Sequence, residues 1–402
     1  MRVIGILVEY NPAQNGHEYQ ISVAKEIYHA DKVILIMSGN FNERGLPGIM
    51  PKEDRAKHGI VMGADIVIEL PLCYSVADIS GMALGAIDIF YKLGIVDYML
   101  FGSESGELNE LYEMANIMKS ERYQQLYQEI FKSTGRASVS RIETLNKMGH
   151  THYANIVNNP NNLLGTTFVS LLQQYGGKIK PLTHKRIGQA YLDDKIDKRS
   201  SGKIYSSATA VRRSLYDEYN KTKTVPENLK YCVPAVVYNY MKQSVNKNFP
   251  MFSDDFYRLI AKKIRAMTIQ ELSGIVGMSS EIALIIKEKE NLNFDEMKQL
   301  LKEKYPNKNF ERIFFRILTN QNQEDYNEYV ENGVVFYVKV LAYNVGSEEL
   351  LNSISENMQI PLLMPFEKEH GQLSELGKKQ YEYELLADKI YYGVLKRKFE
   401  RG

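Results

Sequence analysis

The feature that most constrains the fold is an alternation of short apolar runs with helical segments in the first half of the chain. The runs are rich in Val, Ile and Leu, and they cover residues 2–10, 32–39, 65–71 and 96–101. Strands of a parallel sheet have this composition because helices bury both faces of the sheet. Between the runs, apolar residues recur at helical spacing in 18–30, 51–64 and 80–94. The alternation predicts an α/β fold with a Rossmann-like, doubly wound parallel sheet, to which 178–188 adds a further strand.

The pattern changes after residue 215. A proline-marked break, "TVPENLKYCVP", follows at 224–234, and residues 254–318 are mostly helical and highly charged. A length of 402 residues allows two or three domains. We therefore expect an α/β domain over residues 1–215 and a mainly α-helical C-terminal domain over residues 216–402. The apolar stretch 333–344 fits either a strand or a buried helix, and its periodicity does not decide between them.

Composition excludes several classes of protein. The net charge is +1, so any contact with a polyanion must come from a local basic surface. Cys73 and Cys232 lie far apart without metal-ligand spacing, which argues against a zinc site and a disulfide framework and fits a reducing cytoplasm. No apolar run approaches the roughly 18 residues of a membrane span, so we expect no membrane partner.

The turn after the first apolar run carries the strongest functional signal. It reads "VEYNPAQNGHEYQ" over residues 8–20. Pro12 ends the strand, Gly16 permits close approach of the backbone, and His17 falls at the start of the next helix. Free N–H groups and the helix dipole make such a helix start an anion site, at the edge of the sheet where ligands bind. We predict a cradle for nucleotide phosphates in which His17 donates to the reacting phosphate; the alternative is an Asx-Pro turn with a surface histidine.

This turn resembles the HxGH signature of the nucleotidyltransferase superfamily. The whole chain resembles the bacterial tRNA(Met) cytidine acetate ligase family, whose N-terminus typically reads "VEYNPFHNGH". Further segments match in order: "MSGNFNERGLP" (37–47), "GADIVIELP" (63–71), "FGSESG" (101–106), "PNNLLG" (160–165), "SSATAVRRSL" (206–215) and "ADKIY" (387–391). The resemblance implies that residues 1–215 form a nucleotidyltransferase-like catalytic domain. It also implies an enzyme that activates acetate with ATP and acetylates N4 of the wobble cytidine of elongator tRNA(Met). The histidines show no metal-like spacing, so we expect Mg²⁺ to arrive with ATP.

The resemblance also implies a set of ATP-binding residues. Gly102 ends a strand and Arg186 places a cation near the triphosphate. Ser206 or Ser207 caps a helix that brings Arg212 and Arg213 toward the β- and γ-phosphates. Between two adjacent asparagines we prefer Asn162 to Asn161. We expect Glu43, Arg44 and Gly45 to shape the acetate or adenylate pocket. The full expected set is Leu7, Val8, Glu9, Tyr10, Asn11, Pro12, Ala13, Gln14, Asn15, Gly16, His17, Glu18, Tyr19, Gln20, Gly102, Asn161, Asn162, Arg186, Ser207, Thr209 and Arg212.

One departure from the family pattern affects the site itself. Gln14 stands where the family has the first histidine of HxGH. A glutamine hydrogen-bonds a phosphate but cannot carry a positive charge. If that histidine supplies one charge-assisted contact, its loss costs roughly 10²–10³ in rate. We therefore expect His17 and Gln14 to be the catalytic residues of a divergent and attenuated enzyme.

Two basic stretches are candidates for contact with tRNA. Residues 176–230 contain 13 Lys and Arg against 6 Asp and Glu. In the helical part, the spacing of five basic residues suggests that several share one helical face: Lys302, Lys304, Lys308, Arg312 and Arg316. The alternative is that these residues only solvate a helix surface.

Three hypotheses about function remain open at this stage. The first is a ligase that acts on tRNA, and the second is an adenylyltransferase that acts on a small molecule. The third is a degenerate homologue that binds nucleotide or RNA. The missing first histidine favours the second and third, whereas the joint presence of the other motifs favours the first. The sequence leaves the oligomeric state open.

Overall fold

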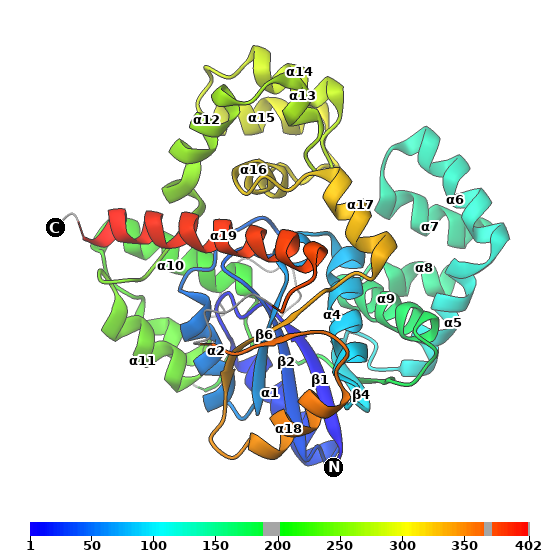
Figure 1. Cartoon of the computed structure of the whole chain (residues 1–402). Helices are drawn as coiled ribbons and strands as arrows, with labels where there is room; N and C mark the ends of the chain where they lie inside the picture. Colours follow the sequence, from blue (N-terminus) through cyan, green and yellow to red (C-terminus); the bar gives the residue numbers. More distant parts are fainter. Residues whose placement is uncertain (188–201, 366–371, 401–402) are drawn as a thin grey trace.

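The computed structural model describes residues 1–187, 202–365 and 372–400 (Figure 1). A seven-stranded sheet with the order β5-β4-β1-β2-β3-β6-β7 forms its centre. Strands β1 to β5 are parallel, as the alternation of segments predicted, and β6 runs antiparallel to β3. The strands are β1 (Val3–Val8), β2 (Lys32–Ser38), β3 (Ile66–Leu70), β4 (Tyr98–Ser103), β5 (Lys180–Lys185), β6 (Val338–Tyr343) and β7 (Leu362–Leu363).

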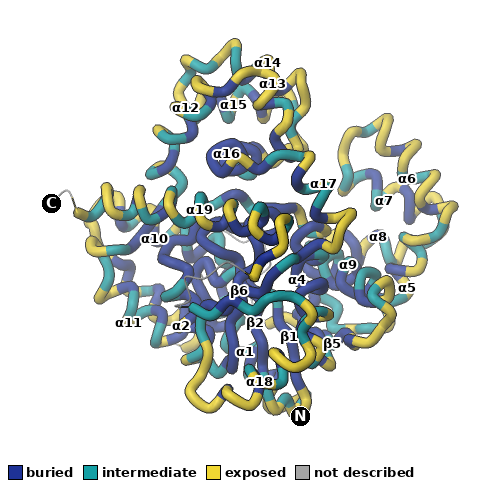
Figure 2. The backbone as a smooth tube through the Cα atoms, in the orientation of Figure 1, coloured by how far each residue is buried: buried dark blue, intermediate teal, exposed yellow. Residues whose placement is uncertain are grey.

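Helices cover both faces of the sheet, and the strand sequences explain why. In β2 the buried side chains alternate between two cores, with Val33 and Leu35 in one and Ile34 and Ile36 in the other. The first core includes side chains from α1 (Asn15–Ser22), α2 (Lys52–Val61), α10 (Ala208–Thr222) and α11 (Ala235–Ser244). The second core includes side chains from α4 (Ile79–Leu93), α5 (Leu108–Lys119), α9 (Pro160–Gln174) and α18 (Glu348–Asn357). Figure 2 shows the buried strands between exposed outer helix surfaces.

A third core lies over the loops that follow the strands. It joins Phe41 and Leu72 to side chains of residues 251–318, here called the helical part, and of the long helix α19 (Glu375–Phe399). The helical part lies at the top of Figure 1, and α5 to α8 project to one side. The remaining α-helices are α3 (Leu72–Ser75), α6 (Glu121–Thr134), α7 (Ala137–Lys147), α8 (Thr151–Val157), α12 (Tyr257–Ala266), α13 (Ile269–Ser273), α14 (Ser280–Glu288), α15 (Phe294–Lys304), α16 (Phe310–Leu318) and α17 (Gln323–Asn332). A π-helix, η1 (Val23–Ile27), and two 3-10 helices, η2 (Glu227–Tyr231) and η3 (Ser253–Phe256), complete the set among the described residues.

The undecided stretch 333–344 contains strand β6, which extends the sheet beyond β3. The sheet therefore does not stop at the expected division near residue 215, and that division stays a prediction. A buried ion cluster holds the late strand in place. Lys52 contacts Glu69 at 2.7 Å and Asp388 at 2.6 Å, and Lys339 of β6 contacts Glu69 at 3.0 Å. The cluster joins α2, β3, β6 and α19.

Two further expectations bear on the class of protein. Cys73 and Cys232 are both free and buried, so they form no disulfide. Within the three described ranges, every helix is too short or too polar to cross a membrane.

Candidate active site

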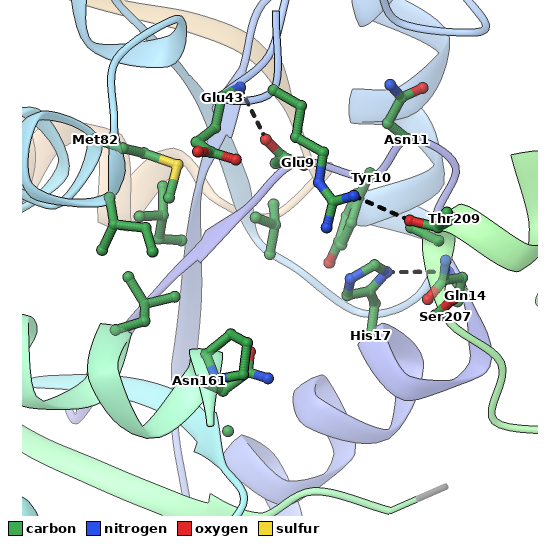
Figure 3. A pocket seen from close by; sticks show the side chains of 18 of the residues that line it. Glu9, Tyr10, Asn11, Gln14, His17, Glu43, Met82, Asn161, Ser207 and Thr209 are labelled. Carbon is green, nitrogen blue, oxygen red and sulfur yellow. Dashed lines mark hydrogen bonds between the residues drawn. The ribbon is translucent and has the colours of Figure 1, made fainter. Parts of the chain in front are cut away.

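A cavity of about 620 Å³ opens at the carboxyl ends of β1 and β4 (Figure 3). Ligands of doubly wound sheets bind at this edge. The cavity brings together most of the residues expected to bind ATP: Leu7, Val8, Glu9, Tyr10, Asn11, Gln14, His17, Gln20, Gly102, Asn161, Arg186, Ser207, Thr209 and Arg212.

Other expected residues do not line this cavity. Gly16 and Tyr19 line a smaller pocket beside it, of about 50 Å³. Asn15 points away and donates to the carbonyls of Ile204 at 3.0 Å and Tyr231 at 2.7 Å, so it anchors the turn. The remaining residues outside both pockets are Pro12, Ala13, Glu18 and Asn162.

His17 has a defined protonation state. The backbone N–H of Gln14 donates to Nδ1 of His17 at 3.0 Å, so Nδ1 is an acceptor and the proton resides on Nε2. Burial, reinforced by the charge of Arg186, lowers the pKa of His17 to about 3. The ring of Tyr10 packs beside it, with centroids 4.9 Å apart. His17 is therefore a neutral Nε2–H donor at the start of α1.

Gln14 ties this helix start to a second one. In its hydrogen-bonding orientation, the amide nitrogen donates to the carbonyl of Ser206 at 3.1 Å, and the amide oxygen accepts from the N–H of Ala208 at 2.6 Å. Ser207 caps α10 by accepting from the N–H of Ala210 at 3.1 Å. The N-termini of α1 and α10 thus converge on one cavity, which favours negative charge. Both amide atoms of Gln14 serve this junction rather than a phosphate, which differs from the direct contact expected.

A buried arginine that the sequence analysis did not single out braces the ends of two strands. Arg55 on α2 donates to the carbonyl of Glu9 at 2.7 Å and to that of Ser38 at 3.2 Å. Next to Glu9, Tyr10 adopts φ 48°, a left-handed conformation that costs a non-glycine residue free energy. No spacing signal could have revealed Arg55, because its helix only approaches the strand ends once the sheet forms.

The segments 102–104 ("GSE") and 160–162 ("PNN") are joined by hydrogen bonds. Glu104 accepts from the backbone N–H of Asn162 at 2.8 Å and from the side-chain amide of Asn161 at 2.6 Å, so it caps the N-terminus of α9. Asn162 accepts from the N–H of Ser105 at 3.0 Å and is buried. Asn161 lines the cavity instead, so the structure places it, rather than the preferred Asn162, at the ligand position.

The two sides of the cavity differ in charge. Arg186 and Arg212 line it near His17, and Arg212 donates to the carbonyl of Asn11 at 2.8 Å. Arg44 donates to the hydroxyl of Thr209 at 3.1 Å. Three carboxylates line the other side: Glu9, Glu43 and Glu311. Burial, and then the neighbouring Glu9, raise the pKa of Glu43.

Two of the five basic residues expected on an RNA surface have other roles. Arg316 is 7% exposed and donates to the carbonyls of Val76 and Val276, each at 3.0 Å. Burial lowers its pKa to about 10. Arg312 is paired with the carboxylate of Glu43 and donates to its carbonyl at 2.7 Å. Both guanidinium groups are engaged by other parts of this chain, so the expected common basic face is not formed.

The other three basic residues are exposed. Lys302 and Lys304 lie on α15, and Lys304 pairs with Glu281 at 3.0 Å. Lys308 lies between α15 and α16 and donates to the carbonyl of Gly277 at 3.0 Å. Of the basic segment 176–230, residues 188–201 lie outside the described residues.

Comparisons with known proteins agree with this geometry. A family model described as "HIGH Nucleotidyl Transferase" matches residues 1–401. A tRNA(Met) cytidine acetate ligase of Acetivibrio thermocellus is 30% identical over 399 residues, which cover 97% of this chain and 94% of that protein. The corresponding protein of Oceanobacillus iheyensis is 30% identical, with coverage of 99% and 96%.

Two solved structures share the fold. Apo Thermotoga maritima TmcAL has a TM-score of 0.88 at 23% identity, and the comparison covers 98% of this chain and 95% of that chain. The same protein bound with alpha-thio ATP has a TM-score of 0.85 at 24% identity, with the same coverage. The match along nearly the whole chain, together with the cradle built by β1, α1 and α10, establishes that this chain belongs to the HIGH nucleotidyl transferase family and, within it, to the tRNA(Met) cytidine acetate ligases.

Proposed function

We propose that this protein is an ATP-dependent ligase that forms acetyl-adenylate and transfers the acetyl group to N4 of the wobble cytidine of elongator tRNA(Met). The observation that carries the proposal is the convergence of two helix N-termini and the Nε2–H donor of His17 on one cavity. The family assignment supports the choice of acetate and tRNA as substrates. The cytoplasm, where tRNA and ATP meet, is the proposed site of action.

In the first half-reaction, a carboxylate oxygen of acetate attacks the α-phosphorus of ATP, and pyrophosphate leaves with the electron pair of the broken P–O bond. The triphosphate lies on the cationic side of the cavity, beside Arg186, Arg212 and the start of α10. His17 donates from Nε2 to the charge that develops on the phosphate. Because the ring is neutral, it supplies this hydrogen bond without giving up its proton.

Mg²⁺ accompanies ATP in this proposal. The described part of the chain brings together no group of three or more His, Cys, Asp or Glu side chains that could hold a metal ion. Most of the ion's ligands would therefore be triphosphate oxygens and water, as is common for nucleotide-bound Mg²⁺. The ion would neutralise charge on the leaving pyrophosphate.

The decisive experiment incubates the protein with bulk tRNA, ATP and isotope-labelled acetate and follows the tRNA by mass spectrometry. We expect one labelled acetyl group on a cytidine, together with pyrophosphate release that needs acetate but not tRNA. Acetate-dependent pyrophosphate release without any tRNA product favours an adenylyltransferase for a small molecule. Absence of ATP binding leaves only a degenerate homologue.

A further inference from the structure

The acidic side of the cavity is poorly suited to binding a triphosphate. Glu9 and Glu43 lie across the cavity from His17, near Met82, as Figure 3 shows. Glu311 of α16 lines the same side. Carboxylates repel phosphate groups, so this wall fits a ligand group that donates hydrogen bonds. In acetyl transfer such a group exists, because the cytosine N4 is an amine that carboxylates accept from.

The loop that carries Glu43 is a tight turn closed by hydrogen bonds across it. The N–H of Asn42 donates to the carbonyl of Leu46 at 3.0 Å, and Leu46 donates back to the Asn42 side chain at 3.1 Å. The N–H of Glu43 donates to Oε1 of Glu9 at 3.0 Å. A turn closed in this way fixes the direction of the Glu43 side chain before any substrate binds.

Helix α16 clamps this turn from outside. Arg312 donates through Nε to the carbonyl of Glu43 at 2.7 Å and through Nη2 to Oε1 of the same residue. Asn309 donates to the carbonyl of Arg44 at 3.2 Å. Gly45 has φ +73°, and a Cβ there would lie 2.3 Å from Cα of Arg312, so only glycine permits this approach.

The clamp leaves one oxygen of Glu43 for a ligand. Oε1 is held by Arg312, and among the described residues no hydrogen bond reaches Oε2. The other two carboxylates of the wall also have one engaged oxygen, since Oε1 of Glu9 accepts from the Glu43 N–H and Oε1 of Glu311 is paired with Lys298. Glu43 differs from both because Arg312 holds its carboxylate and its backbone carbonyl together, which fixes the direction of the side chain.

We propose that Glu43 binds the N4 amino group of the target cytosine and accepts its proton during acetyl transfer, and that Arg312 is the positioning residue that aims it. This inference rests on the proposed function. The N4 lone pair attacks the acetyl carbon, and the bond from that carbon to the adenylate oxygen breaks. AMP leaves with the bonding electrons, and one N4 proton passes to Oε2 of Glu43. The product is N4-acetylcytidine with no oxidant or reductant required.

The electrostatics of Glu43 suit a proton acceptor. Burial and the neighbouring Glu9 raise its pKa, whereas Arg312 and Arg44 oppose the rise, and Asp78 adds to it. A base works best when its pKa lies close to the working pH while the group remains ionised. The rate of acetyl transfer should therefore rise with pH as Glu43 ionises.

The test separates the two half-reactions. Enzyme is first charged with ATP and labelled acetate, then mixed with tRNA, and acetyl transfer is followed in a single turnover. Glu43→Gln should slow transfer at least 100-fold while acetate-dependent pyrophosphate release falls less than threefold. Glu43→Asp, which keeps the charge and shortens the side chain, should slow transfer about tenfold. Thermal melting checks that both variants fold.

The pH profile distinguishes proton acceptance from mere positioning. Wild-type transfer should show an inflection that is absent from Glu43→Gln. Arg312→Gln should move the inflection to higher pH, because it removes the cation that lowers the pKa of Glu43, and Arg312→Lys should restore it in part. Glu227→Gln breaks an exposed ion pair with Lys242 and is the matched control, with transfer unchanged.

Three results would overturn the inference. Equal losses in both half-reactions would place Glu43 in the acetate or ATP site instead. Wild-type rates in Glu43→Gln, in a protein that does acetylate tRNA, would refute this inference alone. A wild type that makes no acetyl-adenylate would refute the proposed function, and this inference with it.

Discussion

The turn between β1 and α1 and the segment 302–316 were both predicted to contact an anion, yet only the turn has the expected arrangement. His17 lines the cavity with its Nε2 donor available. Arg316 of α16 is buried and donates to two backbone carbonyls. Arg312 binds Glu43. Basic residues close in sequence therefore have different partners.

The two predictions differed in outcome because the sequence reports the location of a turn after a strand more directly than the partner of a side chain on a helix. A strand end in a parallel sheet fixes where the next turn lies, so a donor in that turn has a predictable location. A guanidinium on a helix has five N–H donors that satisfy carbonyls and carboxylates as well as phosphates. Which of these it meets depends on how α16 packs, and helical spacing does not report that packing.

The largest effect is expected from removing the hydrogen-bond donor of His17, in the turn between β1 and α1. His17→Ala should reduce acetyl-adenylate formation about 10³-fold, because it deletes the hydrogen bond to the developing charge. The rate of acetate-dependent pyrophosphate release measures the effect. His17→Gln, which keeps a neutral donor, should lose about tenfold only. A wild-type rate in His17→Ala would remove this residue from the reaction.

Replacing the buried arginine should affect folding rather than chemistry. Arg316→Met leaves the carbonyls of Val76 and Val276 without their donor, and we expect a loss of about 3 kcal/mol in the free energy of unfolding, measured with urea. Lys302→Met, at an exposed site on the neighbouring helix, should stay within about 0.5 kcal/mol. Similar stabilities for the two variants would contradict the assignment of Arg316 to the core.

A moderate effect is expected from the exposed lysines, which are the remaining candidates for an RNA surface. Replacing Lys302, Lys304 and Lys308 together by Gln should weaken tRNA binding about tenfold and lower the log–log salt slope by about 2. ATP affinity should not change, because none of the three lines the cavity. If filter binding across a salt series gives the same slope for both proteins, tRNA binds elsewhere.

The smallest expected effect concerns pH, because His17 should add no pH dependence to the rate of adenylation. Acid would have to protonate Nδ1 of His17, which already accepts from the Gln14 N–H, and the pKa is lowered to about 3. The ring therefore stays neutral as the pH falls from 8 to 5. Adenylation rates of wild type and His17→Gln should have parallel pH profiles in that window. An inflection near pH 6.5 found only in wild type would show that His17 works as a cation.

The sequence predicted the parallel strands and the place of the turn after β1 at the edge of the sheet because these signals are local: apolar runs, a proline, a glycine and a helix start within a few residues. It could not decide whether 333–344 is a strand, because β6 pairs with β3, far away in the chain. The role of Glu104 was also hidden, since a carboxylate that caps a helix some 55 residues later leaves no spacing pattern. Asn161 and Asn162 differ only in the direction that α9 gives each side chain.

The late arrival of β6 has a consequence for synthesis on the ribosome. Strands β1 to β5 can pair as soon as residue 185 has emerged, but the outer edge of β3 stays unpaired until residues beyond 338 follow. During that interval a nascent chain exposes a row of backbone donors and acceptors, together with Glu69, which still lacks Lys339. We therefore expect slow translation through residues 254–318 to prolong the exposure of this edge, and a chaperone that covers it to raise the yield of native protein.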